Sequence, residues 1–563
     1  MSYSVAPPTS IPELQSSSPC HPSRFHFVGA WLVVLLPAVI ALVFIPTLAS
    51  PFLVPKASLL LIAVGAIVAC AELCGASAGL RKLPKGLVTT LLAWSAWQGV
   101  AFVFSPLKRM GVEALVFSIA GPLLFLAAVV LLQGSLQRLI VAVSASASLI
   151  ATVALAQFAF HFDPFVLFHG SSSQSGRMRV FGTLGNPDFC GEFLAATLPA
   201  ICCLRSRAWR WSALLLTLAA ILCTGSRAAM TAAAVALGVY MVLSETRQQR
   251  KTLIAAAVLA VLACGLLASG RWNGRPLSTA LEGRVTLWRA SLSPITRSGS
   301  GPGTFSYVYL PRVGEALQRG VPLDPRFLMA ERHAQNDFVE AIVETGPLGA
   351  VLMLAVLLAW AKAARGRHGE AVPLAFAIVA SIAVSAMFDF PLHRAETLAL
   401  LAIAMALPFA EAAETPSSTS SRLSLRAPLA ALLLAALTWT ALPPLMSSRY
   451  TRRGLEAEAR IELASAAENY RRALGWQESN TDAQFSLTRA LALQERYPGA
   501  LRQSQIAQEY IAEPELWILR ARILESMGEE QRAWSEMETA ARIFPYSPLP
   551  KMEIEAIRSN LQH

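Results

Sequence analysis

The sequence predicts an all-α protein in which a polytopic bundle of about 12–13 transmembrane helices is followed by a periplasmic α-helical repeat domain. Three observations carry this prediction. Of the 563 residues, 54% are hydrophobic and only 15% are charged, and the mean hydropathy of +0.49 is too high for a soluble protein of this length. Long apolar runs recur up to residue 446. From residue 451 onward the chain is charged, amphipathic and rich in alanine.

About thirteen apolar runs are long enough, some only barely, to cross about 30 Å of hydrocarbon as helices. The pair at 211–243 is broken at "TGSR", so it could also form one kinked span or a re-entrant element. The runs lie near residues 28–48, 55–74, 86–104, 112–133, 138–160, 190–204, 211–223, 226–243, 252–269, 347–362, 371–389, 395–410 and 427–446.

The distribution of charge predicts the orientation in the membrane. Residues 1–27 are rich in Pro and Ser and lack the pattern of a cleaved signal peptide, so we expect a disordered cytoplasmic tail before an uncleaved signal anchor. The net charge of +11 comes from clusters in alternate connections, which indicates the positive-inside rule rather than nucleic-acid binding. The clusters are Arg81, Lys82 and Lys85; Arg138; Arg205, Arg207 and Arg210; Arg247, Arg250 and Lys251; Lys362, Arg365 and Arg367; and Arg422 and Arg426.

This pattern predicts a multi-pass membrane protein with a cytoplasmic N-terminus. The expected parts are a membrane domain at 28–446, with a large periplasmic loop at 270–346, and a periplasmic repeat domain at 447–563. An odd number of spans would export that last domain. Most of the eight cysteines lie in apolar runs, and no CxxC or HxxxH spacing occurs, so we expect neither a disulfide framework nor a metal site.

Pairs of alanines recur at offsets of 34 and 33 residues in the C-terminal part. They are Ala466 and Ala473, Ala500 and Ala507, and Ala533 and Ala540. Small residues seven apart on one helix face, repeated at this period, predict tetratricopeptide-like repeats. An unrelated bundle of helical hairpins is the alternative. Such repeats bind partners through a concave face, so this domain predicts docking of a protein partner rather than chemistry.

Ionisable residues gather at the expected outer face. They are Arg179, Arg227, Arg284, Arg332, His333, Asp389 and His393. Each alone would be an ordinary solvated residue, but together at helix mouths they are costly unless they are paired, hydrated or bound to a ligand. A diphosphate would suit them, because arginine presents a fixed fork of donors to phosphate oxygens. The loop "SGSGPGTF" at 298–305 lacks the GxxxxGK pattern, so no nucleotide cofactor is expected.

The stretch "RVFGTLGNPDFCGEF" at 179–193 is a polar elbow between apolar runs. Gly185, Asn186 and Pro187 predict a turn that brings the chain back into the membrane, with Asp188 as a candidate helix cap. Arg179 is the residue of this elbow that we assign to the site.

Six motifs together resemble the bacterial O-antigen ligase/polymerase family over residues 90–410. They are "RVFGTLGNPDFCGEFLAATLP", "CTGSRAA", "GRVTLWRASL", "GSGPGTF", "HAQNDFVEAIVETGPLG" and "FDFPLH", in the family's order and topology. The resemblance implies an inverting, metal-independent glycosyltransferase without a cofactor. Its donor would be an undecaprenyl-diphosphate-linked glycan in the lipid bilayer. Its acceptor could be a growing glycan, the lipid A core or a protein hydroxyl.

The resemblance also implies site residues. Arg227 and Arg284 match the family's pair of diphosphate-handling arginines, and Arg179, Arg289 and Arg332 are further candidates. The family's "HAHND" element carries its presumed catalytic histidine at the position of Gln335, beside Asn336. Glutamine cannot act as a base, although it can orient a hydroxyl.

The candidate catalytic residues are therefore His333, Gln335, Asn336, Asp389 and His393, of which His333, Asp389 and His393 are the possible bases. Three readings stay open: the base has moved, stabilisation of the leaving group carries most of the rate, or the reaction has been lost. In the last case the protein would be a non-catalytic scaffold of a polysaccharide assembly or export complex. A transporter is disfavoured, because the expected spans carry few charges and no convincing inverted repeat of broken helices.

Overall fold

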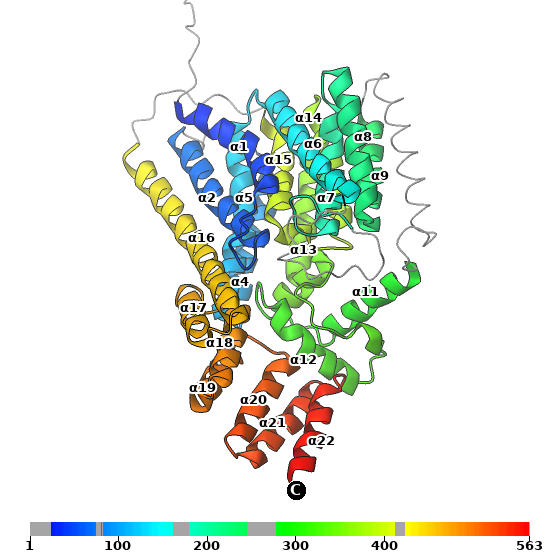
Figure 1. The fold of residues 1–563 in the computed structure, drawn as a ribbon. Helices are drawn as coiled ribbons and strands as arrows, with labels where there is room; N and C mark the ends of the chain where they lie inside the picture. The colour runs from blue at the N-terminus through cyan, green and yellow to red at the C-terminus, as the bar shows by residue number, and fades with distance from the viewer. Residues whose placement is uncertain are drawn as a thin grey trace, which may run out of the picture.

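The computed structural model describes residues 24–74, 80, 83–160, 179–244, 277–410 and 423–561. Within these ranges the regular structure consists of α-helices and two short 3-10 helices, with no strand, which confirms the all-α prediction. The apolar helices pack side by side in one half of the molecule, and the C-terminal helices lie beyond one end of them (Figure 1).

Seven of the described helices are long and apolar enough to cross a membrane, where every backbone polar group must be satisfied within the helix. They are α1 (Arg24–Leu42), α2 (Leu53–Leu73), α4 (Lys85–Phe104), α5 (Lys108–Leu131), α6 (Leu136–Phe160), α13 (Asp337–Arg365) and α16 (Leu423–Ala459). Three shorter helices are also apolar: α9 (Arg227–Leu243), α14 (Ala371–Ser385) and α15 (Ala395–Ala410). The chain is a multi-pass membrane protein. The expected run at 252–269 lies outside the described residues.

The interior of the bundle is built around α15 and α7 (Pro187–Cys202). Every residue of α15 is buried, and in α7 all residues from Phe189 to Cys202 are buried. Helices with no exposed stripe must be surrounded on all sides, so these two are the centre of the bundle. Loops at their ends are therefore held by several neighbouring helices.

The "TGSR" break separates two distinct helices. Helix α8 (Arg207–Thr224) ends where Gly225 adopts a left-handed φ of 66°, and Ser226 then caps α9 by accepting a hydrogen bond from the Ala229 amide. Gly225 and Ser226 supply a C-cap and an N-cap in succession, which ends one helix and starts the next. Residues 211–243 therefore belong to two helices rather than to one continuous helix.

The polar elbow turns as expected, but its cap is a different residue. Asn186, not Asp188, caps α7, because its Oδ1 accepts the Asp188 amide at 2.8 Å. Pro187 occupies the first helical turn, and Gly185 has a φ of 78° and lies so close to Phe52 that a side chain would not fit. Asp188 instead pairs with Arg179 at 3.0 Å.

Helix α13 is kinked at Gly346, whose φ of 72° and ψ of 173° are not helical. The Gly-rich loop packs into this kink: the amides of Ser300 and Gly301 donate to the carbonyls of Val343 and Glu344, at 3.0 and 2.8 Å. The Gly-rich loop therefore fixes the angle between the first turns of α13 and its membrane-spanning part.

The C-terminal helices are α17 (Leu463–Trp476), α18 (Thr481–Leu493), α19 (Tyr497–Ala507), α20 (Pro514–Ser526), α21 (Glu530–Ile543) and α22 (Leu549–Leu561). The six repeated alanines are fully buried among them, as close helix packing requires. Helix α16 runs unbroken from the membrane bundle into this array, so the expected boundary at 447 falls inside a helix rather than in a linker. We retain tetratricopeptide-like repeats as our proposal for this array, and call helices α17–α22 the repeat helices.

Polar contacts join the repeat helices to the membrane part. Arg109 lies 3.5 Å from Glu478 and 3.3 Å from Glu509, and the Gln477 amide donates to the Glu113 carboxylate at 2.7 and 2.9 Å. Two further helices, α11 (Leu277–Ser291) and α12 (Phe305–Gln318), lie beside them with the short η1 (Pro325–Phe327). Together with the continuous α16, these contacts place the repeat helices against the end of the bundle where the polar loops gather.

Replacing Gly346 by alanine should destabilise the protein by at least about 1–2 kcal/mol, the cost of a left-handed non-glycine residue. The added Cβ would also overlap the Arg297 carbonyl. Thermal unfolding of the purified protein in detergent measures the effect. Gly366→Ala is the matched control at the end of the same helix, since its φ is −80° and its nearest neighbour, the Ala363 carbonyl, lies at 3.8 Å. Equal melting temperatures for the two variants would contradict the role given to the kink.

Candidate functional site

One large cavity, of about 1110 Å³, lies where the membrane helices meet the repeat helices. Its walls come from α2, α4, α5, α13, α14, α15 and α16, from the Gly-rich loop, and from residues 477–489 and 510–515 of the repeat part. On the membrane side the lining is largely apolar. Polar and charged side chains line the end formed by the repeat helices. A cavity of this size at a junction between structural units is the usual setting of a small-molecule site.

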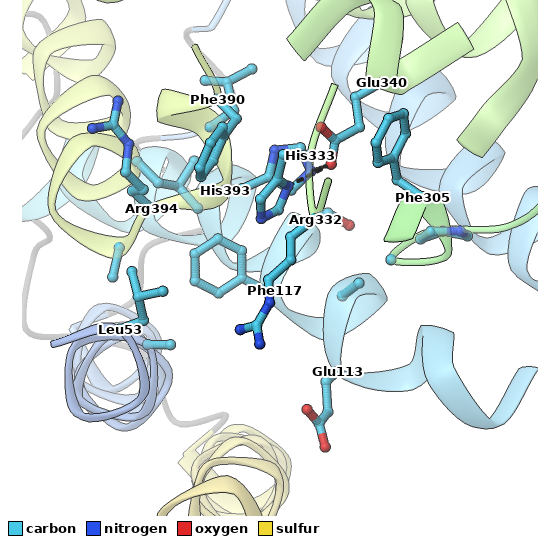
Figure 2. Close-up of a pocket in the computed structure, with 18 of the residues that line it drawn as sticks. Leu53, Glu113, Phe117, Phe305, Arg332, His333, Glu340, Phe390, His393 and Arg394 are labelled. Atoms are coloured by element: carbon cyan, nitrogen blue, oxygen red, sulfur yellow. Dashed lines mark hydrogen bonds and ion pairs between the residues drawn. The ribbon is translucent and has the colours of Figure 1, made fainter. Parts of the chain in front are cut away.

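His333 lies in the cavity wall, in the loop that precedes α13 (Figure 2). Its Nδ1 is 2.8 Å from Oε1 of Glu340, a buried carboxylate in the first turns of α13. The other oxygen of Glu340 accepts the Ala334 amide at 2.9 Å, and the His333 ring stacks on Phe390 at a centroid distance of 3.9 Å. The imidazole is thus fixed in position by a carboxylate on its edge and an aromatic ring on its face.

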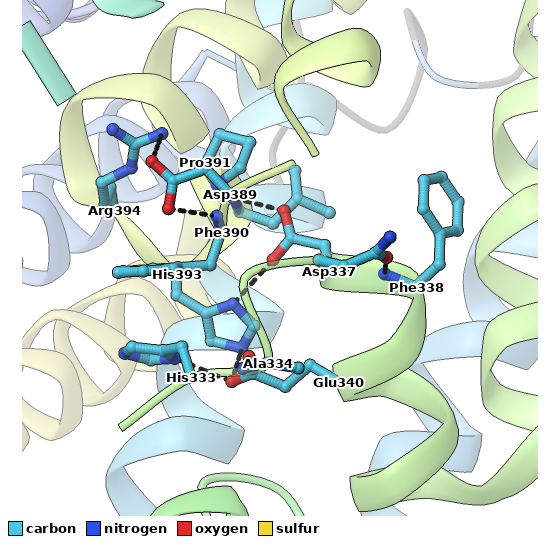
Figure 3. A network of polar contacts seen from close by, with 12 residues as sticks. His333, Ala334, Asp337, Phe338, Glu340, Asp389, Phe390, Pro391, His393 and Arg394 are labelled. Atoms are coloured by element: carbon cyan, nitrogen blue, oxygen red, sulfur yellow. Dashed lines mark hydrogen bonds and ion pairs between the residues drawn. The ribbon is translucent and has the colours of Figure 1, made fainter. Parts of the chain in front are cut away.

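His393, in the short η2 (Pro391–His393), joins the same cluster from the other side (Figure 3). Its Nδ1 is 2.9 Å from Asp337, and its Nε2 is 3.4 Å from the Glu340 oxygen that also contacts His333. Burial by itself lowers the pKa of His393, but the charges of Glu340 and Asp337 outweigh it and raise this pKa to about 10. His393 therefore holds its proton at neutral pH.

Backbone contacts fasten this cluster in place. Asn336 caps α13 by accepting the amides of Phe338 and Val339, and its Nδ2 donates to the Met387 carbonyl at 2.9 Å. The Asp337 amide donates to the Ala386 carbonyl, also at 2.9 Å. Asn336, expected as a catalytic residue, is thus placed as the cap that ties the start of α13 to the loop after α14.

A second buried ion pair lies behind Phe390. Arg394 is fully buried, pairs with Glu192 of α7, and lies 3.9 Å from Asp389. Its guanidinium also lies over the Phe189 ring, at 4.4 Å from the centroid. Burial raises the pKa of Asp389, an effect that Arg394 opposes. Asp389, a candidate base in the sequence, is not among the residues that line the cavity, so the structure places it as a partner of Arg394.

Gln335 and His333 both lie in the loop before α13 rather than on a helix. Gln335 has a left-handed φ of 52° in the loop, and α13 begins only at Asp337. Its side chain hydrogen-bonds Glu331. Because His333 and Gln335 lie in a loop, their side chains need not point to opposite sides as they would on one helix. His333 reaches Glu340 without any shift of α13.

The candidate arginines separate into groups. Of the five candidate arginines, only Arg332 lines the cavity, and its guanidinium points into it (Figure 2). Its side chain is 75% exposed and lies 3.2 Å from Asp482 of α18. Arg284 lies on α11, one turn before Trp288, whose indole donates to the Ala334 carbonyl at 2.9 Å. Arg284 is therefore close to the His333 loop without lining the cavity. Arg289, on the same helix, is exposed.

Arg179 and Arg227 lie near each other, beside the start of α7. Arg179 donates to the Thr224 carbonyl at 2.9 Å, three residues before Arg227, and pairs with Asp188. Gly191 of α7 packs so closely against Thr224 and Ala229 that a side chain would not fit. The structure thus brings these two arginines close to each other, and neither of them lines the cavity.

His333, Glu340 and His393 also present ligand atoms that lie within 4.8 Å of one another, a spacing compatible with a metal ion. In the structure the Nδ1 of His333 is hydrogen-bonded to Glu340 at 2.8 Å, and the Nδ1 of His393 is hydrogen-bonded to Asp337 at 2.9 Å. A bound cation would have to replace the bond between His333 and Glu340. The cluster is thus a candidate metal site as well as a closed network of two histidines and two acids.

The residues that the sequence reasoning missed are Asp337, Glu340, Arg394 and Glu192. A signal for the first two was present, because Asp337, Glu340 and Glu344 recur on one face directly before an apolar run, where carboxylates are costly without partners. Arg394 follows His393 in sequence but carried no pattern of its own. Its pairing with Glu192 joins segments far apart in the chain, which only the fold shows.

The raised pKa of His393 predicts a pH-dependent stability. A histidine whose pKa rises from 6.5 to about 10 on folding stabilises the protein fully below the unfolded value, and this contribution is lost as pH rises through about 10. Wild type should therefore melt well above His393→Gln near pH 6.5, and the gap should close toward pH 10. The exposed His368 provides the control, since His368→Gln should melt with wild type throughout. A gap that stays constant with pH would contradict the assignment.

Comparison with known proteins agrees with this geometry. Residues 212–354 match the family model described as O-antigen ligase. The matched segment includes Arg227, Arg284, His333 and Glu340, and it ends before His393 and before the repeat helices. A search of curated proteins finds no match. Residues 212–354 of this membrane protein are thus similar to the O-antigen ligase family.

Proposed function

We propose that this protein transfers a glycan from an undecaprenyl-diphosphate carrier to a hydroxyl acceptor at the periplasmic face of the bacterial inner membrane. One observation carries the proposal: His333, held by a buried carboxylate, lies in a cavity that joins apolar membrane helices to a polar wall. A lipid-linked sugar needs both surroundings at once. The match to the O-antigen ligase family supports the same class of reaction.

His333 is the proposed general base. Its Nδ1 is bonded to Glu340, which leaves Nε2 to accept a proton from the acceptor hydroxyl. A carboxylate that orients an imidazole in this way also stabilises the imidazolium that forms. In this proposal the base has moved from the position of Gln335 to His333, and Gln335 serves the loop through its contact with Glu331.

The leaving group is the lipid diphosphate. The acceptor oxygen attacks the anomeric carbon, its proton passes to His333, and the bond from that carbon to the diphosphate oxygen breaks with inversion. The electron pair stays on the diphosphate. His393, protonated at neutral pH, and Arg332 are the cations on the cavity side that would stabilise this charge as it develops. No cofactor takes part.

The other arginines keep supporting roles in the proposal. Arg284 would act near the loop of His333 through the contact of Trp288 with Ala334. Arg179, Arg227 and Arg289 do not line the cavity. We therefore propose that they contact the diphosphate of the carrier outside the cavity. The periplasmic orientation follows from the basic clusters in the alternate connections, which would lie in the cytoplasm.

We expect His333→Ala and Glu340→Gln each to lower glycan transfer by about 100-fold or more, the usual contribution of a general base. Membranes supplied with lipid-linked glycan provide the assay, and the yield of transferred glycan is the measurement. Gln335→Ala is the matched control, because it removes the residue at the family's histidine position and should retain most activity.

The reverse order of effects, with Gln335→Ala inactive and His333→Ala active, would contradict the assignment of the base. The same assay in excess EDTA should keep its rate, since the proposed step uses no metal. A rate that EDTA abolishes and zinc or manganese restores would instead favour the metal site at His333, Glu340 and His393.

A non-catalytic scaffold is the second candidate function, and glutamine at position 335 is the observation that favours it. Deleting residues 451–563 does not separate the two functions, because these residues form one wall of the cavity. The point variants do. A scaffold should complement a deletion strain equally well with or without His333→Ala, whereas an enzyme should not.

A further inference from the structure

The polar end of the cavity is built largely by helices that lie outside the O-antigen ligase segment. We call this end the glycan arm and define it by lining residues 477–489 and 510–515. It opens from the same space that His333 and His393 line, and Arg332, next to His333, lies 3.2 Å from Asp482 of the arm. The opposite, apolar end is lined by α2, α4, α5 and α15.

We propose that the glycan arm is a binding site for the sugar chain of a substrate, and that it selects neutral or amino-bearing glycans over acidic ones. This inference rests on the proposed function, in which a lipid occupies the apolar end. The sugar chain must then leave the reacting centre on the polar side, where the repeat helices form the wall.

The side chains of the arm suit a carbohydrate. Carboxylates and hydroxyls supply acceptors and donors for sugar hydroxyl groups, among them Asp482, Ser479 and Thr481. Phe485 adds a half-exposed aromatic ring whose face can cover the apolar side of a sugar. Aromatic surface beside hydrogen-bonding groups is the chemistry that sugar rings require.

The charge of the arm gives the selectivity. The arginine of the arm, Arg489, pairs with Glu458 at 2.9 Å, and Arg332 beside the arm pairs with Asp482 at 3.2 Å. Glu513 and Glu515 form no ion pair within the described part of the chain, so negative charge remains in excess. Burial raises the pKa of Glu513, as do the charges of Glu515 and Asp482, and the charge of Arg332 opposes them. An acidic sugar would be repelled here, and an ammonium group would be attracted.

Binding of lipid-free tetrasaccharides to the purified full-length protein tests the inference without requiring transfer. The probes are a glucosamine tetramer, maltotetraose and a galacturonate tetramer, titrated at low salt with thermophoresis. We expect the cationic tetramer to bind most tightly and the acidic one least. Glu513→Gln/Glu515→Gln should weaken binding of the glucosamine tetramer about fivefold and leave that of maltotetraose unchanged.

Two further variants control this result. Phe485→Leu keeps an apolar side chain but loses the ring, so it should weaken all three probes. Glu555→Gln removes an exposed carboxylate of α22 that does not line the cavity and should change nothing. The inference is overturned if the acidic tetramer binds as well as the cationic one, if no probe binds, or if the Glu513/Glu515 double variant matches wild type.

The transfer assay then assigns the arm to one substrate. A raised KM for the acceptor in the double variant assigns it to the acceptor glycan, and a raised KM for the lipid-linked donor assigns it to the donor glycan. Unchanged KM values for both would overturn the inference in an active enzyme. If no transfer occurs while the probes still bind in the expected order, the proposed function fails and the glycan arm stands.

Discussion

The neutralisation of two buried carboxylates, Asp337 and Glu340, is the constraint on which the site depends. Both lie in the first turns of α13, at the mouth of a membrane-spanning helix, where an unpaired charge is costly. Glu340 has His333 as its partner, and Asp337 has His393. One histidine precedes α13 and the other follows α14, so meeting this constraint brings two separate loops together in one cavity wall.

The positions of these two histidines and two carboxylates depend in turn on the rigid segments packed around them. The kink at Gly346 and the Gly-rich loop hold the first turns of α13, while Arg394 and Glu192 hold the loop of His393 against α7. The repeat helices are also among these segments. Helix α16 enters them without a break, and Arg332, next to His333, reaches Asp482. The repeat helices therefore contribute to the walls of the site.

Much of the architecture was readable from the sequence. Hydropathy predicted the membrane helices, and the periodic alanines predicted a packed helical array, because both signals are local and repeat along one helix face. Of the candidate site residues, His333, His393 and Arg332 do line one cavity. Asp389 and Asn336 do not line it: the first pairs with Arg394 and the second caps α13. Asn186 rather than Asp188 caps α7.

The sequence by itself determined the membrane character, the order of the helices and the unusual glutamine at position 335, since each depends on residue type and spacing alone. Only the tertiary structure decided which charges meet. The pairs His333 with Glu340, His393 with Asp337, Arg394 with Glu192 and Arg332 with Asp482 join segments that no spacing rule relates. Buried charges must find partners wherever the fold supplies them, so their positions follow from packing rather than from sequence pattern.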